Sequence, residues 1–355
     1  MRNTQRLGLR YPVVHYTCRA VAAALVVTFP LASLAAPAEA APDPAAEIQR
    51  LLARAVPQVG SGIAQALGIL AAILSSAGIL ATLNLSGSSN FSNSVVDGAG
   101  EVGLRPGSVY SRGITVGGRP RTYDVILPRG YSKAKSYPVI IGFGGWKHDA
   151  AAARGYQRLE SVAGNAIVVY AQGVDNAWGG APYANTSLDH DIAYVRGVIG
   201  DVAARYGGDP SRVAAIGLSN GGGMAAALAC HAPGTVKAVA SVAGAYYTPT
   251  VTGCAPGAVA ALMVHGTDDA TVGYGGGARH GKPYASVDAV AGAFAAKNGC
   301  SAQWGEVRAG SASIITPESC AAETRVVKVW GGGHTWFSGG PDATSETVRF
   351  VQRNL

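Results

Sequence analysis

Three residues in the second half of the chain have the types and the spacing for nucleophilic catalysis. Residues 217–221 read GLSNG, which fits the pattern G-x-S-x-G that places a serine on a sharp turn between a strand and a helix. A serine hydroxyl is a weak nucleophile, so it needs a base, and the base needs an acid that orients it. On this pattern an acid and then a histidine are expected further along the chain.

Candidates for both partners follow apolar runs that have the length of buried strands. Asp268 and Asp269 come just after AALMVHG (260–266), and His334 lies in the glycine-rich stretch that follows TRVVKVW (324–330). The order serine, acid, histidine is the one expected after a G-x-S-x-G turn. We therefore predict Ser219 as the nucleophile, His334 as the base and Asp269 as the acid, with Asp268 as the close alternative. His265 ends the preceding run and is predicted to be structural.

The elements that must position these residues alternate between strands and helices. Short apolar runs predict strands at 137–143, 166–172, 212–217, 236–244, 260–266 and 324–330. Helical stretches separate them at about 150–164, 188–206, 220–230, 286–299 and 344–353. A hairpin around Gly117 and Gly118 is expected before the first of these strands. Such alternation predicts an α/β fold whose mostly parallel sheet is covered by helices on both faces, with functional groups at the carboxyl ends of the strands.

Four short segments together resemble one enzyme family. GLSNGGGMA, HGTDDATV, NGC and GGGHTW look like the secreted polyhydroxybutyrate-depolymerase-type esterases, which include feruloyl and acetylxylan esterases. The resemblance covers about residues 108–355. It implies an α/β-hydrolase fold and hydrolysis of carboxylic esters without a cofactor or metal. The family's HGTxDxxV segment places the acid at Asp269, and its tryptophan two residues after the histidine corresponds to Trp336.

One departure from that family concerns the loop that would stabilise the oxyanion. The family has a His-Gly pair after its first parallel strand, whereas this chain has FGGW at 143–146. The glycine backbone remains available, so the expected donors are the backbone N–H of Asn220 and those of Gly144, Gly145 and Trp146. Backbone N–H groups so placed stabilise a tetrahedral intermediate.

Aromatic residues near these segments are candidates for a substrate-binding wall. Trp178 lies in the glycine-rich stretch DNAWGGAPY, Tyr183 follows in the same stretch, and Trp336 follows the predicted base. Ordinary core packing is the alternative for all three. Trp178 is the leading candidate because of its glycine-rich context.

The beginning of the chain is typical of an export signal. Four arginines, the last being Arg19, precede the uncharged run 20–38, which ends in small residues. This order of charged, apolar and small residues predicts a signal peptide over 1–40, with an uncleaved membrane anchor as the alternative. The formal charge of the whole chain is +7, and removal of 1–40 leaves 24 basic against 20 acidic residues, or +4. No basic cluster remains that would suggest a nucleic-acid partner.

The cysteines agree with export. Cys18 lies in the predicted signal, and four remain after it: Cys230, Cys254, Cys300 and Cys320. An even number in an exported chain indicates two disulfides. Pairing between sequence neighbours, 230 with 254 and 300 with 320, closes short loops and is the expected connectivity; four buried thiols are the alternative. The protein is expected to be secreted or associated with the cell envelope.

A second apolar stretch precedes the predicted catalytic domain, which spans 106–355. Residues 55–96 carry no charge, and 63–85 would be long enough to cross a bilayer. Because a stop-transfer segment would leave the disulfides in the wrong compartment, we interpret 41–105 as an apolar N-terminal segment and linker. Residues 59–85 are predicted to contact a lipid or polymer surface.

These patterns favour a secreted serine esterase that acts on polyester, short-chain acyl, feruloyl or acetyl-polysaccharide esters. The partner is then an ester substrate, which can be polymeric. An envelope acyltransferase that resembles mycolyltransferases is the alternative enzyme, since water and sugar acceptors differ only by pocket shape. A non-catalytic protein that binds polymer or envelope is a third hypothesis, and the complete set of Ser219, Asp269 and His334 counts against it.

Overall fold

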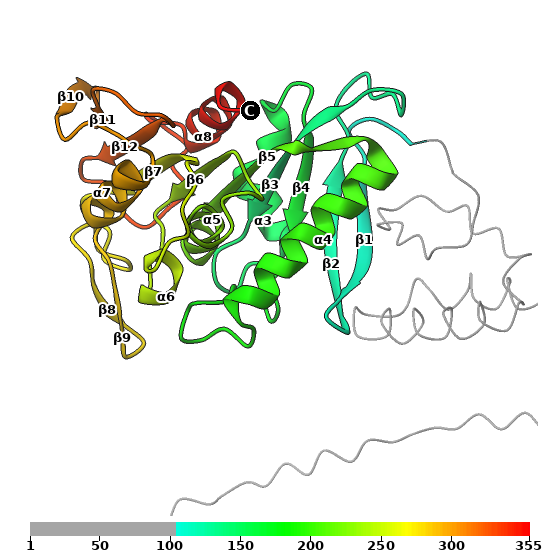
Figure 1. The fold of residues 1–355 in the computed structure, drawn as a ribbon, viewed down its shortest axis with the longest axis horizontal. Helices are drawn as coiled ribbons and strands as arrows, with labels where there is room; N and C mark the ends of the chain where they lie inside the picture. The colour runs from blue at the N-terminus through cyan, green and yellow to red at the C-terminus, as the bar shows by residue number, and fades with distance from the viewer. Residues whose placement is uncertain (1–103) are drawn as a thin grey trace, which may run out of the picture. The chain divides into compact units, whose positions relative to one another are not determined.

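The computed structural model describes residues 104–355. The expected signal peptide, the segment that follows it and the proposed surface contact at 59–85 lie outside the described residues, so these expectations and the boundary near residue 105 stay predictions. The described part contains the predicted strands and helices (Figure 1).

A ten-stranded sheet forms the centre of the described part, in the order β1-β2-β4-β3-β5-β6-β7-β12-β11-β10 (Figure 1). Its six middle strands are parallel to their neighbours, and the two strands at each edge run antiparallel. The strands are β1 (Val109–Val116), β2 (Arg119–Ile126), β3 (Tyr137–Phe143), β4 (Ile167–Ala171), β5 (Gly208–Leu218), β6 (Ala238–Val242), β7 (Ala260–Gly266), β10 (Trp304–Ala309), β11 (Ala312–Pro317) and β12 (Thr324–Val329).

Helices cover both faces of this sheet. Apolar residues of α3 (Ala150–Gln157) and α8 (Ala343–Arg353) pack on one face, and those of α4 (Leu188–Tyr206), α5 (Asn220–His231) and α7 (Val287–Lys297) pack on the other. Two short helices, η3 (Leu159–Ser161) and α6 (Thr248–Val251), lie in the connections. Because side chains alternate along a strand, Val213 and Ala215 of β5 face one layer while Ala214 and Ile216 face the other.

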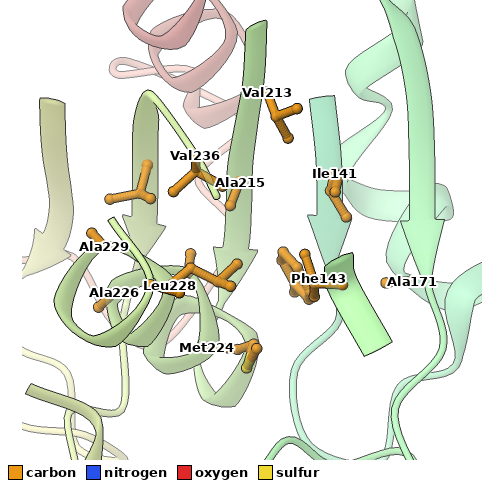
Figure 2. Close-up of a cluster of buried hydrophobic side chains, with 14 of the residues drawn as sticks. Ile141, Phe143, Ala171, Val213, Ala215, Met224, Ala226, Leu228, Ala229 and Val236 are labelled. Atoms are coloured by element: carbon orange, nitrogen blue, oxygen red, sulfur yellow. The ribbon is translucent and has the colours of Figure 1, made fainter. Parts of the chain in front are cut away.

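Small residues bring α5 close to the sheet. Figure 2 shows Met224, Ala226, Leu228 and Ala229 of this helix beside the side chains of the central strands. Every residue of α5 except the last is buried. Alanine and glycine leave room for this close approach, which fixes the start of the helix, and with it Ser219, against the ends of β3 and β5.

The edges of the sheet are hairpins. The expected turn at Gly117 and Gly118 joins β1 to β2, and both glycines have positive φ, 57° and 75°, as the favoured two-residue hairpin turns require. A second hairpin, β10–β11, was not expected from the sequence. A third, β8 (Gly277–Arg279) with β9 (Lys282–Tyr284), lies outside the large sheet.

The expected disulfides are confirmed. Cys230 is bonded to Cys254 and Cys300 to Cys320, with S–S distances of 2.04 and 2.01 Å. The first bond ties the end of α5 to the loop before β7, and the second ties the end of α7 to the loop before β12. Within residues 104–355, no helix combines the length and the apolar character that crossing a membrane requires.

Candidate active site

Ser219 lies on the turn between β5 and α5 in a backbone conformation that few residues adopt. Its φ is 54° and its ψ is −117°, and a non-glycine residue with positive φ is uncommon and strained. The turn is held by hydrogen bonds of the Ser219 backbone: its N–H donates to the Val242 carbonyl of β6 at 2.9 Å, and its carbonyl accepts from the Ala245 N–H at 2.9 Å. The side chain is thereby presented at the carboxyl end of the sheet.

Two glycines flank the serine because the backbone leaves no room for a side chain there. A Cβ on Gly217 would lie 2.1 Å from the Gly221 carbonyl oxygen, and a Cβ on Gly221 would lie 2.4 Å from the Phe143 carbonyl oxygen. Both neighbours are backbone atoms that cannot rotate away. The G-x-S-x-G pattern is thus a steric requirement of this turn and of its contact with the loop after β3.

This crowding predicts the effect of Gly217→Ala. We expect the free energy of unfolding to fall by about 1–3 kcal/mol, the usual range for overpacking, and kcat to fall by about 10²-fold because the serine is displaced. Chemical denaturation and ester hydrolysis measure the two effects.

Gly200→Ala is the matched control for that substitution. Gly200 is exposed on α4, and a Cβ there would meet nothing within 4 Å, so stability should be unchanged or rise by about 0.5–1 kcal/mol. Equal behaviour of the two alanine variants would contradict the steric argument.

The acid and the base come together because their strands are neighbours. β7 and β12 are parallel and end in register, with Gly266 opposite Val329. The loops beyond them touch: the Asp268 N–H donates to the Gly332 carbonyl at 3.0 Å, and the Thr267 N–H donates to the Val329 carbonyl at 2.9 Å. Two sequence segments about 65 residues apart therefore form one rigid support at the carboxyl end of the sheet.

The three predicted residues form a hydrogen-bonded chain. Nε2 of His334 lies 2.9 Å from Oγ of Ser219, and Nδ1 of the same ring lies 2.7 Å from Oδ2 of Asp269. Asp269 is buried, whereas Asp268 is exposed and its carboxylate accepts from the Thr267 hydroxyl. The geometry thus joins Asp269, not its neighbour, to the histidine.

The Asp269 carboxylate is held by several donors besides the histidine. Its Oδ1 accepts from the N–H groups of Thr271 and Val272, both at 2.8 Å. Burial alone would raise its pKa, but hydrogen bonds from His265, His334 and the Val272 amide outweigh burial and hold the pKa of Asp269 well below its usual range. The carboxylate is therefore ionised at neutral pH.

His265, predicted to be structural, supports that acid. Its side chain is buried, and Nε2 lies 2.8 Å from the Val272 carbonyl oxygen and 3.2 Å from Oδ2 of Asp269. Both neighbours are acceptors, so Nε2 carries the proton. His265 fixes the acid's loop and donates to the carboxylate oxygen that faces His334.

A cleft of about 420 Å³ opens above Ser219. Its walls are largely aromatic: the rings of Trp146 and Tyr183 stack with centroids 4.2 Å apart, and the His280 ring meets both edge-on at 5.1 Å. The other lining residues are Gly145, His148, Tyr156, Leu218, Ser219, Ala245, Tyr247, Thr271, Val272, Arg279, His334, Thr335 and Trp336. Tyr183 and Trp336, expected at the substrate, are both among the lining residues.

Trp178 is placed elsewhere. Its ring is 1% exposed and packs edge-on against Phe143 at 4.9 Å. Its indole N–H donates to the Gly144 carbonyl at 2.9 Å. Its backbone N–H donates to Oδ1 of Asn220, and its carbonyl accepts from Nδ2 of the same side chain. The expectation that Trp178 forms part of the substrate wall is corrected by this position, because a ring without accessible surface cannot contact a substrate. It supports the loop after β3 from behind.

The predicted oxyanion donors lie on both sides of Ser219. Asn220 is the first residue of α5, so its N–H lies in the first turn, where amides have no partner within the helix. The loop at Gly144–Trp146 packs on the turn: a Cβ on Gly145 would lie 3.6 Å from Cβ of Ser219. The N–H of Gly145 donates to the Tyr156 hydroxyl at 3.1 Å.

Sequence reasoning did not find several lining residues. Arg279 and His280 line the cleft from the β8–β9 hairpin, and His148 and Tyr156 line it from the loop after β3 and from α3. None of these residues has a motif around it.

Comparison with known proteins decides the family. The family profile described as "Putative esterase" matches residues 115–330, a span that includes Ser219 and Asp269. The chain belongs to this esterase family. It is therefore an enzyme that hydrolyses carboxylic esters.

Individual relatives of this esterase agree. It is 30% identical over 260 residues to "Putative esterase NocK" of Nocardia uniformis, covering 64% of this chain and 74% of the relative. It is 31% identical over 244 residues to "Probable feruloyl esterase C" of Aspergillus terreus, covering 64% and 83%. The solved acetyl xylan esterase from Aspergillus awamori matches with a TM-score of 0.51 at 12% identity, covering 68% of this chain and 99% of that one. Structural neighbours of this kind confirm the expected α/β-hydrolase fold.

Proposed function

We propose that this esterase works through Ser219, His334 and Asp269 and forms an acyl-enzyme. The observation that carries the proposal is the unbroken chain of short contacts from Oγ of Ser219 through both ring nitrogens of His334 to Oδ2 of Asp269. A serine hydroxyl activated by a histidine whose other nitrogen is held by a buried carboxylate is the arrangement that acyl transfer requires.

The geometry gives each residue one task. Nε2 of His334 takes the proton of Ser219 as Oγ attacks the ester carbonyl carbon, and it then gives that proton to the departing alkoxide. Asp269 holds the Nδ1–H tautomer and stabilises the imidazolium that forms between the two transfers. Water, activated by the same Nε2, then releases the acid from Ser219.

We further propose that the acyl part of the preferred substrate is aromatic, as in feruloyl esters. The stacked pair Trp146 and Tyr183, with His280 at its edge, offers a flat apolar wall beside the nucleophile. Offset-stacked or edge-to-face aromatic contacts contribute about 0.5–1.5 kcal/mol beyond the burial of area. A relative named as a feruloyl esterase supports the same choice. Short-chain acyl esters and polyesters are the competing substrates.

The substrate proposal is tested with matched methyl esters. We expect kcat/KM on methyl ferulate to exceed that on methyl hexanoate, and Trp146→Ala to lower this ratio by about 3–10-fold, as the loss of one aromatic contact predicts. Trp304→Ala is the control, because that tryptophan is partly exposed on β10 and does not line the cleft. An aromatic acyl site would be contradicted if the unaltered enzyme had the higher kcat/KM on methyl hexanoate. It would also be contradicted if Trp146→Ala left the ratio of the two kcat/KM values unchanged.

Two proposals rest on sequence together with the disulfides. We propose that the enzyme is secreted or held in the cell envelope, which the two disulfides support because they persist in oxidising compartments. We also propose that residues 59–85 bind a lipid or polyester surface, since a charge-free stretch of this length must be covered. A chain that begins at Val102 should keep its kcat on a soluble ester and lose sedimentation with vesicles or polyester particles; unchanged sedimentation would contradict the surface role.

A further inference from the structure

The hydroxyl of Tyr156 is hydrogen-bonded to a backbone N–H of the loop Gly144–Trp146, which is predicted to bind the oxyanion. Tyr156 is close to the end of α3, and its ring centroid lies 5.4 Å from that of His148 and 5.9 Å from that of Trp336. The side chain lines the same cleft as Ser219. Its oxygen accepts the hydrogen bond of the Gly145 N–H at 3.1 Å, and that N–H is one of the predicted oxyanion donors.

The hydrogen-bond pattern leaves the tyrosine proton available. A phenol has one proton and can also accept, and here the acceptor side is used by Gly145. Within residues 104–355, no side chain or carbonyl accepts a hydrogen bond from the Tyr156 hydroxyl. The Gln157 side chain also lies at this oxygen. Because Tyr156 lines the cleft, a substrate oxygen bound beside Gly145 is an acceptor that the phenol proton can reach.

The loop that carries Gly145 is close enough to the nucleophile for this proton to matter. A Cβ on Gly145 would lie 3.6 Å from Cβ of Ser219, and a Cβ on Gly221 would lie 2.5 Å from the Gly144 carbonyl oxygen. The loop thus packs directly on the serine turn. When the substrate's carbonyl carbon is bonded to Oγ of Ser219, its oxygen would lie beside Gly145. It would then also lie beside the Tyr156 hydroxyl, which is hydrogen-bonded to Gly145.

We propose that the Tyr156 hydroxyl is a side-chain donor of the oxyanion hole, acting with the N–H groups of Gly145 and Asn220. This inference rests on the proposed role of Ser219. In the free enzyme the phenol accepts from Gly145; when the tetrahedral intermediate forms, the oxyanion accepts from both the amide and the phenol. Burial raises the pKa of Tyr156 to about 12, so the phenol stays neutral and able to donate at working pH.

Packing and hydrogen bonds hold the end of α3 against the end of β3. Phe143, the last residue of β3, packs on Trp178 in the core. The side chain of Gln157, the residue after Tyr156, packs against Gly142 of β3: a Cβ on Gly142 would lie 2.6 Å from Gln157 Oε1. Gln157 in turn donates to the Phe143 carbonyl at 2.9 Å. The end of α3 is thus anchored to the end of β3, which holds the phenol in place.

Tyr156→Phe tests the proposal in the full chain. Loss of one oxyanion donor costs on the order of 10²–10³ in kcat, so we expect kcat on a soluble ester to fall by at least about 30-fold while KM changes less than about threefold. The affinity for a trifluoromethyl ketone, which forms an oxyanion on the serine, should fall by a similar factor. The affinity for the matching secondary alcohol, in which CH–OH replaces the ketone carbonyl, should change less than about threefold, because that ligand is neutral and cannot form an oxyanion on the serine.

Tyr137→Phe is the matched control. Its hydroxyl also accepts a backbone N–H, from Ser132 at 2.7 Å, but at the opposite end of β3. This variant should keep kcat and the ketone affinity, whatever it does to the melting temperature.

Three results would overturn the inference, and none of them depends on the triad. The first is a Tyr156→Phe enzyme with unchanged kcat. The second is an increase in kcat, which would mean that the phenol blocks the oxyanion hole. The third is equal loss of affinity for the ketone and for the matching alcohol, which would mean that the phenol only shapes the cleft. Failure of the triad itself would appear separately, as activity retained when Ser219 is replaced.

Discussion

Replacing Ser219 with alanine should lower kcat on any ester substrate by on the order of 10⁶-fold, the loss measured when the nucleophile of a comparable triad is removed. The residual rate would come from the oxyanion hole and substrate binding alone. The fold should remain intact, because the serine side chain makes one hydrogen bond, to Nε2 of His334, and lies at the floor of an open cleft. Single-turnover kinetics and a melting curve measure the two effects.

Covalent labelling identifies the nucleophile independently of rate. An organophosphonate should attach to Ser219 in the unaltered enzyme at one equivalent per chain, and should not attach to Ser219→Ala. Ser241 serves as the control and should stay unlabelled, because it is buried on β6 and its hydroxyl accepts a hydrogen bond from the Tyr246 hydroxyl at 2.8 Å. Stoichiometric labelling of any serine other than Ser219 would sink the assignment.

The central strands and helices could be predicted because each carries its own local signal. β7 is a mostly apolar run that is buried at every position. Helix α4 is capped at its start by Ser187, whose side chain accepts from the His190 N–H, and at its end by Gly207 with φ 70°. Serine caps and a left-handed glycine are the usual helix boundaries. A strand that is apolar on both faces must be covered by helices on both sides, so such runs are placed at the centre of a parallel sheet.

The triad could be predicted for a related reason. A G-x-S-x-G turn, an acid after one strand and a histidine after the next need no knowledge of side-chain packing, only the rule that parallel strands end at one edge. The choice of Asp269 over its neighbour came from the resemblance to known esterases. Its physical basis is visible only in the fold, where Oδ1 of Asp269 meets two amides.

The cleft wall could not be predicted because it depends on contacts between distant loops. Trp178 has the glycine-rich context of a binding loop, yet Asn220 and the Gly144 carbonyl draw it into the core. His280 has no motif, and it meets Trp146 and Tyr183 only through the position of a small hairpin. The β10–β11 hairpin is exposed along the whole of β10, so no apolar alternation marks it.

Asp269→Asn should lower kcat by on the order of 10⁴, and the structure gives the reason in terms of proton position. The N–H groups of Thr271 and Val272 both donate to Oδ1. Two amide donors at Oδ1 outweigh the single, longer contact from His265 to Oδ2, so the asparagine carbonyl oxygen takes the Oδ1 place and its NH₂ turns toward Nδ1 of His334. A donor there stabilises the tautomer that carries its proton on Nε2, and that tautomer cannot accept the proton of Ser219.

Asp268→Asn is the control that separates the two carboxylates. Its side chain is exposed and accepts only from the neighbouring Thr267 hydroxyl, so we expect kcat to stay within about threefold of the unaltered enzyme. NMR of the histidine ring nitrogens should show the proton on Nδ1 in this variant and on Nε2 in Asp269→Asn. The opposite ranking of the two variants in kcat would make Asp268 the acid. A 10⁴-fold loss in Asp269→Asn with the Nδ1 proton retained would show that the carboxylate acts through its charge, because the tautomer would then be correct and only the stabilisation of the imidazolium would be missing.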